Sequence, residues 1–463
     1  MPIIDTIFGA VNANGLQINS IDPVLDVTFE GAVVSTTGAA VQLVNEAAEY
    51  TVDMNIDGIV VSAFTSAILY RDNNGTVTVG QTGQVRAETF AIVGFSSNLS
   101  PLNLVNRGFV QSSGTAFSSG AAADLVENSG TLVGTVFLRD GADEIRNSGS
   151  IAGDIIFGDG DDIYNGRDGF VAGNIQGGAG NDTYVVDGPG DIIVEQAGAG
   201  FDEVQSFDTY TLGANIEDLN LRGSANIDGT GNDIANTFNG NAGNNVLKGK
   251  GGPDIFEASG GNDTFRGGSG IDAAFYRSQN KDMVIDLAAG TAVGKFTDTL
   301  IQIERVFGGA GDDTIGGSGA RNTLSGGDGD DEISGRGGND DVFGNAGADV
   351  LLGNGGSDFL DGGTAKDTLN GGTGNDRLLG AAGGDTFVFE GSFDDDQIID
   401  FDVNQGGEKI DLSGVASIRN FNDLRNNHLT DDGTDSTIDD GNGNTILIAG
   451  VVESDFTAGD FIF

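Results

Sequence analysis

The chain of 463 residues contains no cysteine and no tryptophan, and its single histidine is His428. The absence of cysteine excludes disulfides, thiolate zinc sites and cysteine nucleophiles. One histidine cannot provide the two imidazoles of a HExxH zinc site, and no serine has the flanking glycines of a GxSxG nucleophile elbow. The sequence therefore predicts no catalytic residue of these classes, and we expect His428 to be an exposed residue of a C-terminal cap.

Basic residues are also few. The chain has 21 Lys and Arg against 70 Asp and Glu, and its net charge is −49. Such a charge argues against nucleic acid and anionic membrane surfaces as partners, because both would repel it, and it makes cations the natural partners. The first basic residue is Arg71, so the charged start of a Sec-type signal is missing. No apolar run approaches 18 residues, and we expect no transmembrane segment.

A nine-residue unit repeats nine times without a gap over residues 308–388, beginning with GGAGDDTIG. The sixth position is acidic in every unit but one: Asp313, Asn322, Asp331, Asp340, Asp349, Asp358, Asp367, Asp376 and Asp385. The eighth position is always apolar: Ile315, Leu324, Ile333, Val342, Leu351, Leu360, Leu369, Leu378 and Phe387. This pattern predicts a glycine-rich turn followed by a short strand with one inward side chain.

Two such units must form one coil of about 18 residues, because a three-residue strand needs a partner across the core. The sixth-position carboxylates then form two rows, with 313, 331, 349, 367 and 385 in one and 340, 358 and 376 in the other. Like charges stacked about 4.8 Å apart repel, so cations between the turns are needed. Oxygen-only ligation selects a hard ion, calcium before magnesium.

The array resembles the RTX, or hemolysin-type calcium-binding, repeat GGxGxDxUx, which implies a calcium-loaded parallel β-roll. A disordered Gly/Asp-rich linker would have no fixed period and no apolar eighth position. An EF-hand loop at 328 would need a bidentate Glu at its twelfth position, and none is there. The resemblance also implies type I secretion from a Gram-negative cell, with calcium scarce inside and abundant outside.

Upstream, a longer repeat of 19 to 20 residues predicts a parallel β-helix. Its equivalent positions are Gly130, Gly149 and Gly169; Gly134, Gly153 and Gly173; Val136, Ile155 and Ile175; and Asp143, Asp162 and Asp182. A shorter block of nine-residue units has Asn245, Asp254, Asp263 and Asp272 at the sixth position. Asn245 lacks the charge of a full ligand, and Ala274 at an eighth position fills less of the core than its counterparts.

Together these patterns predict an all-β chain, a parallel β-solenoid in which an N-terminal β-helix continues into a calcium-loaded RTX β-roll with a small C-terminal cap. The predicted regions are 1–105, β-rich; 106–188, β-helix; 189–239, solenoid spacer; 240–275, short roll block; 276–307, an insertion of longer strands beside the roll; 308–388, main roll; and 389–463, cap and secretion signal. A helix is plausible only at 419–427. The last residues equally suit a secretion signal or a final strand that seals the solenoid.

The metal ligands expected are Asp143, Asp162, Asp182, Asp254, Asp263, Asp272, Asp313, Asp331, Asp340, Asp349, Asp358, Asp367, Asp376 and Asp385. They would hold multiple calcium ions, roughly ten. Asn322 is expected to mark the weakest site or a missing ion. The function expected is that of a secreted, non-enzymatic structural or adhesive protein of the cell surface, which self-associates into a filament or layer and could contact a surface glycan.

The alternative is a polysaccharide lyase or glycosidase on the N-terminal coils, since paired carboxylates are abundant. Lyases on β-helices use a Lys or Arg base beside calcium, and the N-terminal half has only scattered arginines: Arg71, Arg86, Arg107, Arg139, Arg146 and Arg167. The missing tryptophan also removes the commonest sugar-stacking side chain. A pore-forming toxin is disfavoured because no hydrophobic insertion segment is present.

Overall fold

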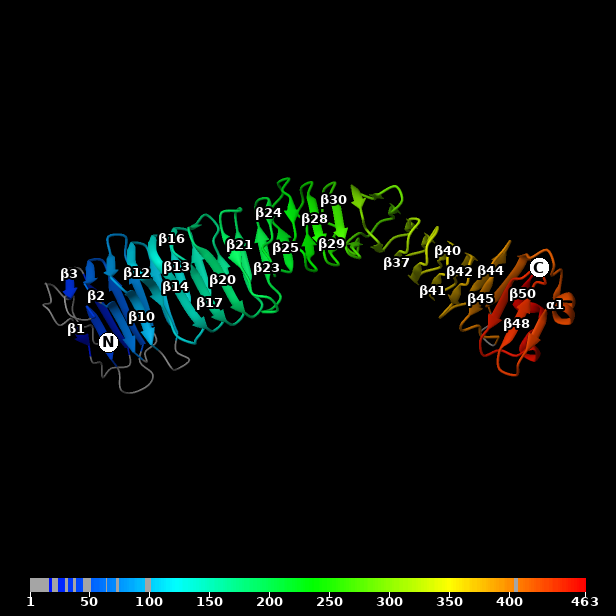
Figure 1. The fold of residues 1–463 in the computed structure, drawn as a ribbon, viewed down its shortest axis with the longest axis horizontal. Helices are drawn as coiled ribbons and strands as arrows, with labels where there is room; N and C mark the ends of the chain where they lie inside the picture. The colour runs from blue at the N-terminus through cyan, green and yellow to red at the C-terminus, as the bar shows by residue number, and fades with distance from the viewer. Residues whose placement is uncertain are drawn as a thin grey trace. The chain divides into compact units, whose positions relative to one another are not determined.

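The computed structural model describes residues 16–18, 24–29, 32–35, 39–44, 51–63, 65–71, 75–95, 101–403 and 407–463. Predictions for the remaining residues, which include parts of the N-terminal region 1–105, lie outside these ranges. The chain divides into two compact units: unit 1 comprises residues 1–222 and 227–236, and unit 2 comprises residues 223–226 and 237–463. Each unit is built from stacked strands, as Figure 1 shows for β2 to β23 in unit 1 and β37 to β45 in unit 2.

Unit 1 is a parallel β-solenoid. The strands of its first row pair in parallel in this order: β2 Val24–Phe29, β5 Thr51–Ile56, β8 Gly75–Val79, β11 Leu102–Asn106, β13 Leu125–Asn128, β15 Glu144–Asn147, β18 Ile163–Asn165, β21 Thr183–Val186, β23 Glu203–Ser206 and β25 Asp218–Leu221.

The second row of unit 1 contains β1 Leu16–Ile18, β4 Val41–Val44, β7 Ser66–Arg71, β10 Phe90–Phe95, β12 Phe109–Ser118, β14 Thr131–Asp140, β17 Ile155–Asp159, β20 Asn174–Ala179 and β22 Ile192–Val194. Joined to it are β3 Ala32–Ser35, β6 Ile59–Ser62, β9 Gln84–Ala87, β16 Ser150–Ala152 and β19 Phe170–Val171. A separate short pair is β24 Tyr210–Thr211 with β26 Gly229–Thr230. The register Val136 to Ile155 to Ile175 confirms the predicted columns of the long repeat.

Unit 2 repeats the arrangement with shorter coils. Its first row is β27 Thr237–Asn239, β29 Ile255–Glu257, β31 Ala273–Phe275, β35 Arg305–Phe307, β37 Thr323–Asp328, β39 Asp341–Ala346, β41 Phe359–Thr364, β43 Arg377–Leu379, β45 Asp395–Ile398, β49 Thr445–Ile448, β48 Ser436–Asp439 and β47 Leu429–Asp431. The last three strands form an antiparallel meander that ends the row.

The second row of unit 2 is β28 Val246–Gly251, β30 Thr264–Ser269, β34 Thr297–Ile301, β33 Thr291–Val293, β32 Val284–Asp286, β36 Thr314–Gly316, β38 Glu332–Ser334, β40 Val350–Gly355, β42 Thr368–Thr373, β44 Thr386–Glu390, β46 Lys409–Gly414 and β50 Phe461–Ile462. Thr314 lies beside Glu332 and Thr323 beside Asp341, 18 residues apart in each row, which confirms the predicted coil of two units. The fold is therefore a parallel β-solenoid, as the sequence predicts.

The core of the array in unit 2 is formed by the apolar eighth-position side chains of the two rows. All nine eighth-position residues of the array have at most 1% of their surface exposed. At the start of unit 2, Phe238 stacks on Phe256 with ring centroids 5.0 Å apart, and Phe256 on Phe265 at 5.3 Å. Each coil thus buries its apolar side chain against the coil before and after it, so the core depends on stacking rather than on a globular interior.

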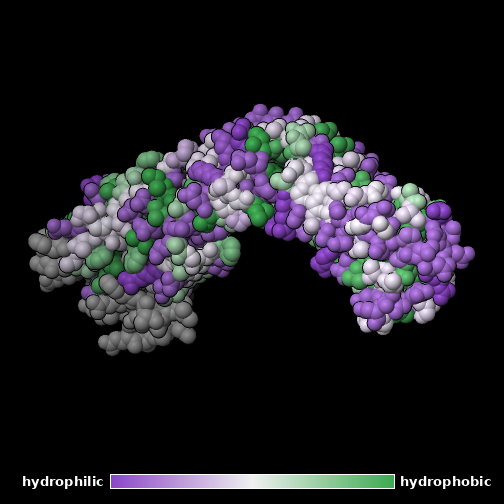
Figure 2. Space-filling view, turned by 45° about the vertical axis from the view of Figure 1, so that its right-hand side comes forward, coloured by the Kyte–Doolittle hydropathy of each residue, from purple (hydrophilic) through white to green (hydrophobic). Residues whose placement is uncertain are grey.

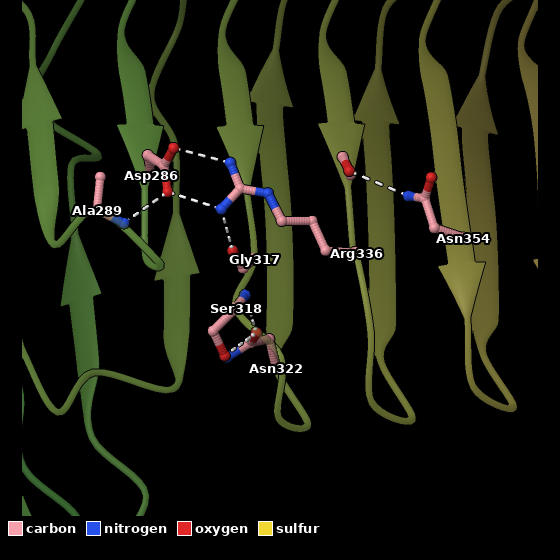
Figure 3. A network of polar contacts seen from close by, with 8 residues as sticks. Asp286, Ala289, Gly317, Ser318, Asn322, Arg336 and Asn354 are labelled. Atoms are coloured by element: carbon pink, nitrogen blue, oxygen red, sulfur yellow. Dashed lines mark hydrogen bonds and ion pairs between the residues drawn. The ribbon is translucent and has the colours of Figure 1, made fainter.

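The segment 276–307 differs from its prediction. Its strands β32, β33 and β34 are three to five residues long and pair antiparallel within the second row, instead of forming longer strands beside the roll. Burial of Ile285, Ala292 and Leu300 explains this, because short strands bring these three side chains into the existing core. The bidentate ion pair of Asp286 with Arg336, at 2.7 Å for both contacts, ties the hairpin to the array (Figure 3).

The C-terminal part of unit 2 contains α1 Phe421–Asn427, inside the segment where a helix is predicted, and the single-turn 3-10 helices Glu453–Asp455 and Ala458–Asp460. Asn420 caps α1 by accepting from two backbone N–H groups. His428 follows the helix as its C-cap and is half-buried rather than exposed, because its ring nitrogen contacts the carbonyl of Asp439. At the end of the chain, β50 pairs with β46 and buries Phe461.

Candidate metal centre

The sixth-position aspartates of the array stack directly on one another in two rows. In the first, the backbone N–H of each aspartate donates to Oδ1 of the aspartate 18 residues later: 313 to 331 at 2.7 Å, 331 to 349 at 2.8 Å, 349 to 367 at 2.8 Å and 367 to 385 at 2.9 Å. In the second, the same bond joins 322 to 340 at 2.7 Å, 340 to 358 at 2.8 Å, 358 to 376 at 2.7 Å and 376 to 396 at 2.8 Å. One carboxylate oxygen of each aspartate from 331 onwards is therefore held by the backbone.

The other carboxylate oxygen is buried and has no hydrogen-bond partner. Among the described residues this is true of Oδ2 in Asp331, Asp340, Asp349, Asp358, Asp367, Asp376 and Asp385. Each of these atoms lies over the glycine that begins its own unit, such as Gly326 under Asp331, where an added Cβ would come closer than 3.0 Å. The glycine keeps this space open. A buried acceptor without a partner is costly, so the geometry requires a donor or cation in the turn.

Burial makes the carboxyl groups of these aspartates harder to ionise. It raises the pKa of Asp331, Asp340 and Asp367 to about 7 and that of Asp376 to about 6, with neighbouring aspartates adding to the shift. Without a cation, the stacked carboxylates therefore tend to hold protons at neutral pH. A bound divalent ion would displace these protons and favour the charged form.

One turn of the array has an amide, that of Asn322, in place of the carboxylate (Figure 3). Its Oδ1 accepts from the backbone N–H of Ser318 at 2.7 Å and from the Ser318 hydroxyl at 3.0 Å. Its Nδ2 donates to the carbonyl of Glu304 at 3.2 Å. The Asn322 side chain is thus hydrogen-bonded to the protein at both Oδ1 and Nδ2, and this turn lacks the unpartnered oxygen found in the turns from Asp331 to Asp385.

In the shorter block, the aspartates are buried in the same way, but Asp263 differs in its partners. The N–H of Asp254 donates to Asp272 Oδ1 at 2.8 Å, and Oδ2 of Asp272 has no partner. Oδ2 of Asp263 instead accepts from the Ser259 hydroxyl at 3.0 Å. At the start of the main array, Oδ2 of Asp313 accepts from the N–H of Gly309 at 3.0 Å. Asp263 and Asp313 are therefore already hydrogen-bonded at both oxygens.

Unit 1 contains a row of the same kind. The N–H of Asp143 donates to Asp162 Oδ1 at 2.6 Å, and that of Asp162 to Asp182 Oδ1 at 2.8 Å. Each of these three aspartates is at most 2% exposed and has an unpartnered Oδ2. Burial raises the pKa of Asp143 to about 7, of Asp162 to about 8 and of Asp182 to about 6. The three aspartates predicted from the long repeat thus share the geometry of the array.

Sequence reasoning missed several members of these rows. Asp124 and Asp202 extend the row of unit 1 at either end, and Asp396 extends the second row of the array, each with a buried unpartnered Oδ2. Asp124 lies 19 residues before Asp143 and Asp202 lies 20 after Asp182, so the spacing was a usable signal. Asp396 follows Asp376 by 20 residues instead of 18, which places it outside the nine-residue register.

Comparison with known families identifies the repeat. The family described as the RTX calcium-binding nonapeptide repeat matches residues 239–273, 303–320, 316–351 and 352–387. These coils are RTX repeats. RTX repeats bind calcium, and rows of buried, unpartnered carboxylate oxygens suit that hard ion. The glycines that begin the units of Asp331 to Asp385 leave the necessary space beside those oxygens.

Other comparisons are more distant. A solved structure, the extracellular lipase LipA from Serratia marcescens, is 18% identical with a TM-score of 0.24, over 54% of this chain and 40% of that one. The chain thus spans less than half the length of that lipase. No curated protein gives a match. In the described part of the chain, no helix has the length and hydrophobicity needed to cross a membrane.

Proposed function

We propose that the protein is a secreted calcium-binding structural or adhesive protein that folds on extracellular calcium and assembles into a surface layer or filament. The observation that carries the proposal is the set of stacked RTX aspartates whose buried oxygens have no partner from the protein. When it is ionised, such a stack is stable only if cations neutralise it. Folding and calcium uptake are therefore one process.

The proposed ligands are the fourteen aspartates predicted from the sequence, extended by Asp124, Asp202 and Asp396. The number of ions is about ten, as expected for sites shared between successive turns. Ten divalent ions add about twenty positive charges and bring the net charge from −49 to roughly −29. This reduction relieves much of the self-repulsion that opposes the compact state.

Calcium dependence gives the chain a route to the cell exterior through type I secretion. Where calcium is scarce, the carboxylates repel each other and the RTX coils stay unfolded, which keeps the chain competent for export. Outside a Gram-negative cell, millimolar calcium fills sites of the extracellular class. The coils then fold where the protein is needed.

Assembly is supported by apolar side chains exposed on unit 1. Phe201 is 75% exposed, Ile192 56% and Phe170 55%. The face of the molecule in Figure 2 is mainly hydrophilic with hydrophobic residues between. Large exposed apolar groups in a strongly acidic protein favour contact with another protein surface once calcium lowers the charge. A second copy or a surface glycan would be the partner.

The test is negative-stain microscopy of the full chain in millimolar calcium and again in chelator. We expect filaments or sheets with calcium and none without it, and a Phe201→Ser variant with weakened assembly. The same preparations are assayed for depolymerisation of an anionic polysaccharide. Isolated monomers in calcium, together with depolymerisation, would replace the structural function with the enzymatic one.

A further inference from the structure

Unit 1 contains a group of three buried carboxylates that differs from the regular rows. One oxygen each from Asp182, Glu195 and Asp202 lies within 4.8 Å of the others. These residues are 1%, 6% and 1% exposed. Asp182 precedes β21 and Asp202 precedes β23, whereas Glu195 follows β22 of the second row. The group therefore combines two neighbouring coils with a side chain from the segment between them.

Each carboxylate has an oxygen left over. Asp182 Oδ1 accepts from the N–H of Asp162 at 2.8 Å, and Asp202 Oδ1 accepts from the N–H of Asp182 at 2.9 Å. Glu195 Oε1 accepts from the Tyr184 hydroxyl. The second oxygen of all three is buried without a partner, and among the described residues none of the three forms an ion pair. Buried carboxylate oxygens without a donor, gathered in one group, require a cation or protons.

Gly177 keeps the space between these oxygens open. A Cβ at this position would lie closer than 3.0 Å to Asp182 Oδ2, Tyr184 Oη and Glu195 Oε1. The three atoms therefore converge over the glycine backbone. Gly177 stands to Asp182 as Gly326 stands to Asp331 in the RTX array, but Glu195 adds a carboxylate that the array turns do not have.

Among the described residues, no Lys, Arg or His forms an ion pair with this group. Burial raises the pKa of all three carboxyl groups. Burial and the adjacent acids raise the pKa of Tyr184, so its hydroxyl stays protonated and orients Glu195 as a donor.

We propose that Asp182, Glu195 and Asp202 form a separate calcium site in unit 1, oriented by Tyr184 and lying outside the RTX repeats matched at 239–387. The site rests on the proposed role of Asp182 as a ligand, but it does not depend on assembly into a layer or filament. Its third carboxylate gives it a higher charge than an array turn. We therefore expect it to be among the tighter sites of the chain.

Tyr184 makes the site observable in the full chain. The sequence has no tryptophan and six tyrosines, none of them within the array at 308–388, so tyrosine-sensitised terbium luminescence reports mainly on sites outside the array. Terbium is a hard, oxygen-seeking ion that substitutes for calcium. We expect sensitised emission from the wild type that calcium competes away. Tyr184→Phe should abolish most of the emission while the number of calcium ions bound, measured by calorimetry, stays the same.

The second experiment removes the charge of one carboxylate of the site at a time. Glu195→Gln and Asp202→Asn keep the size of each side chain, and Asp202→Asn retains the acceptor for the N–H of Asp182. Each should weaken terbium binding at this site at least about tenfold, because ligand charge sets affinity. Asp208→Asn removes an exposed carboxylate of the same unit and serves as the control. Circular dichroism in calcium checks that every variant is folded.

Two outcomes would overturn the proposal. The first is emission that Tyr184→Phe leaves unchanged, because the terbium signal would then come from another tyrosine. The second is equal terbium affinity in Glu195→Gln and Asp208→Asn, which would mean that the three carboxylates hold protons instead of an ion. Microscopy of the same variants separates this result from a failure of assembly, since loss of the site leaves the RTX array intact.

Discussion

Two groups of coils differ in the buried polar residues at the ends of their strands. They are the coils of unit 1 between residues 102 and 186 and the RTX coils of unit 2. Both place a buried aspartate before a strand. In unit 1, however, the other end of those strands carries Asn106, Asn128 and Asn147, each at most 1% exposed. Asn106 Nδ2 donates to Asn128 Oδ1 at 2.7 Å, and Asn128 Nδ2 donates to Asn147 Oδ1 at 2.8 Å.

The row of asparagines and the rows of aspartates differ in whether their hydrogen bonds are complete. An amide is both donor and acceptor, so the asparagine ladder satisfies itself and carries no charge. A carboxylate is only an acceptor, so each turn from Asp331 to Asp385 is left with one oxygen unsatisfied. The coils of unit 1 between residues 102 and 186 have one row of aspartates and one row of asparagines, whereas the RTX coils from Asp331 onwards have a row of aspartates on each side. Dependence on calcium should therefore be strongest in the array.

Removal of calcium is expected to have the largest effect. In chelator, the amides of β36 to β43 should lose hydrogen-exchange protection by more than about a thousandfold, or about 4 kcal/mol, because the stacked charges repel. The amides of β11 to β15 should lose less, because only one of the two side-chain rows of these coils is acidic and their asparagine ladder needs no ion. Exchange measured by mass spectrometry on the full chain, with and without calcium, gives both values. Equal loss in the two segments would contradict the comparison.

The pH dependence of the calcium-free array should be the reverse of the usual one. Folding raises the pKa of Asp331, Asp340 and Asp367 from near 4 to about 7. The folded array therefore binds more protons than the unfolded chain between these values, and its stability falls as pH rises from about 4 to about 7. In chelator, circular dichroism should show β-structure gained on acidification from pH 8 to pH 5. In calcium, the same acidification should displace ions, so a parallel response in both conditions would refute this account.

A substitution that breaks the row of asparagines in unit 1 should destabilise the protein less than calcium removal does. The size of this effect should not depend on calcium. Asn128→Asp keeps the acceptor for Asn106 but loses the donations to Asn147 and to the Ser150 carbonyl. The resulting oxygen faces two acceptors, which should destabilise unit 1 by about 2–3 kcal/mol. Urea unfolding followed by exchange in β13 measures the change. Asn103→Asp, at a half-buried position whose oxygen accepts from the N–H of Leu125, is the control and should be nearly neutral.

The sequence predicts the rows and the core of the RTX array well, because a strict period fixes which residues stack. Ile333 and Leu351 lie on each other as their shared eighth position requires. The sequence does not predict the contacts of residues that lie outside the regular repeat. Glu195 does not stand at a sixth position of the nonapeptide pattern, and only the folded chain brings it to Asp182. The pairing of Asp286 with Arg336, 50 residues apart, likewise depends on how the inserted hairpin enters the sheet.

The smallest expected effect concerns Asn322, the one turn of the array with a self-satisfied amide. Asn322→Asp restores the carboxylate and loses the donation to Glu304. We expect calorimetry to show one more calcium ion bound, while the calcium-free protein loses about 1–2 kcal/mol from an added buried charge. Asn339→Asp adds the same charge at an exposed fifth position, where Asp312 and Asp330 already stand, and should change neither quantity. An unchanged ion count in Asn322→Asp would mean that the wild-type asparagine already holds an ion, and that the neutral and acidic turns differ less than their hydrogen bonds indicate.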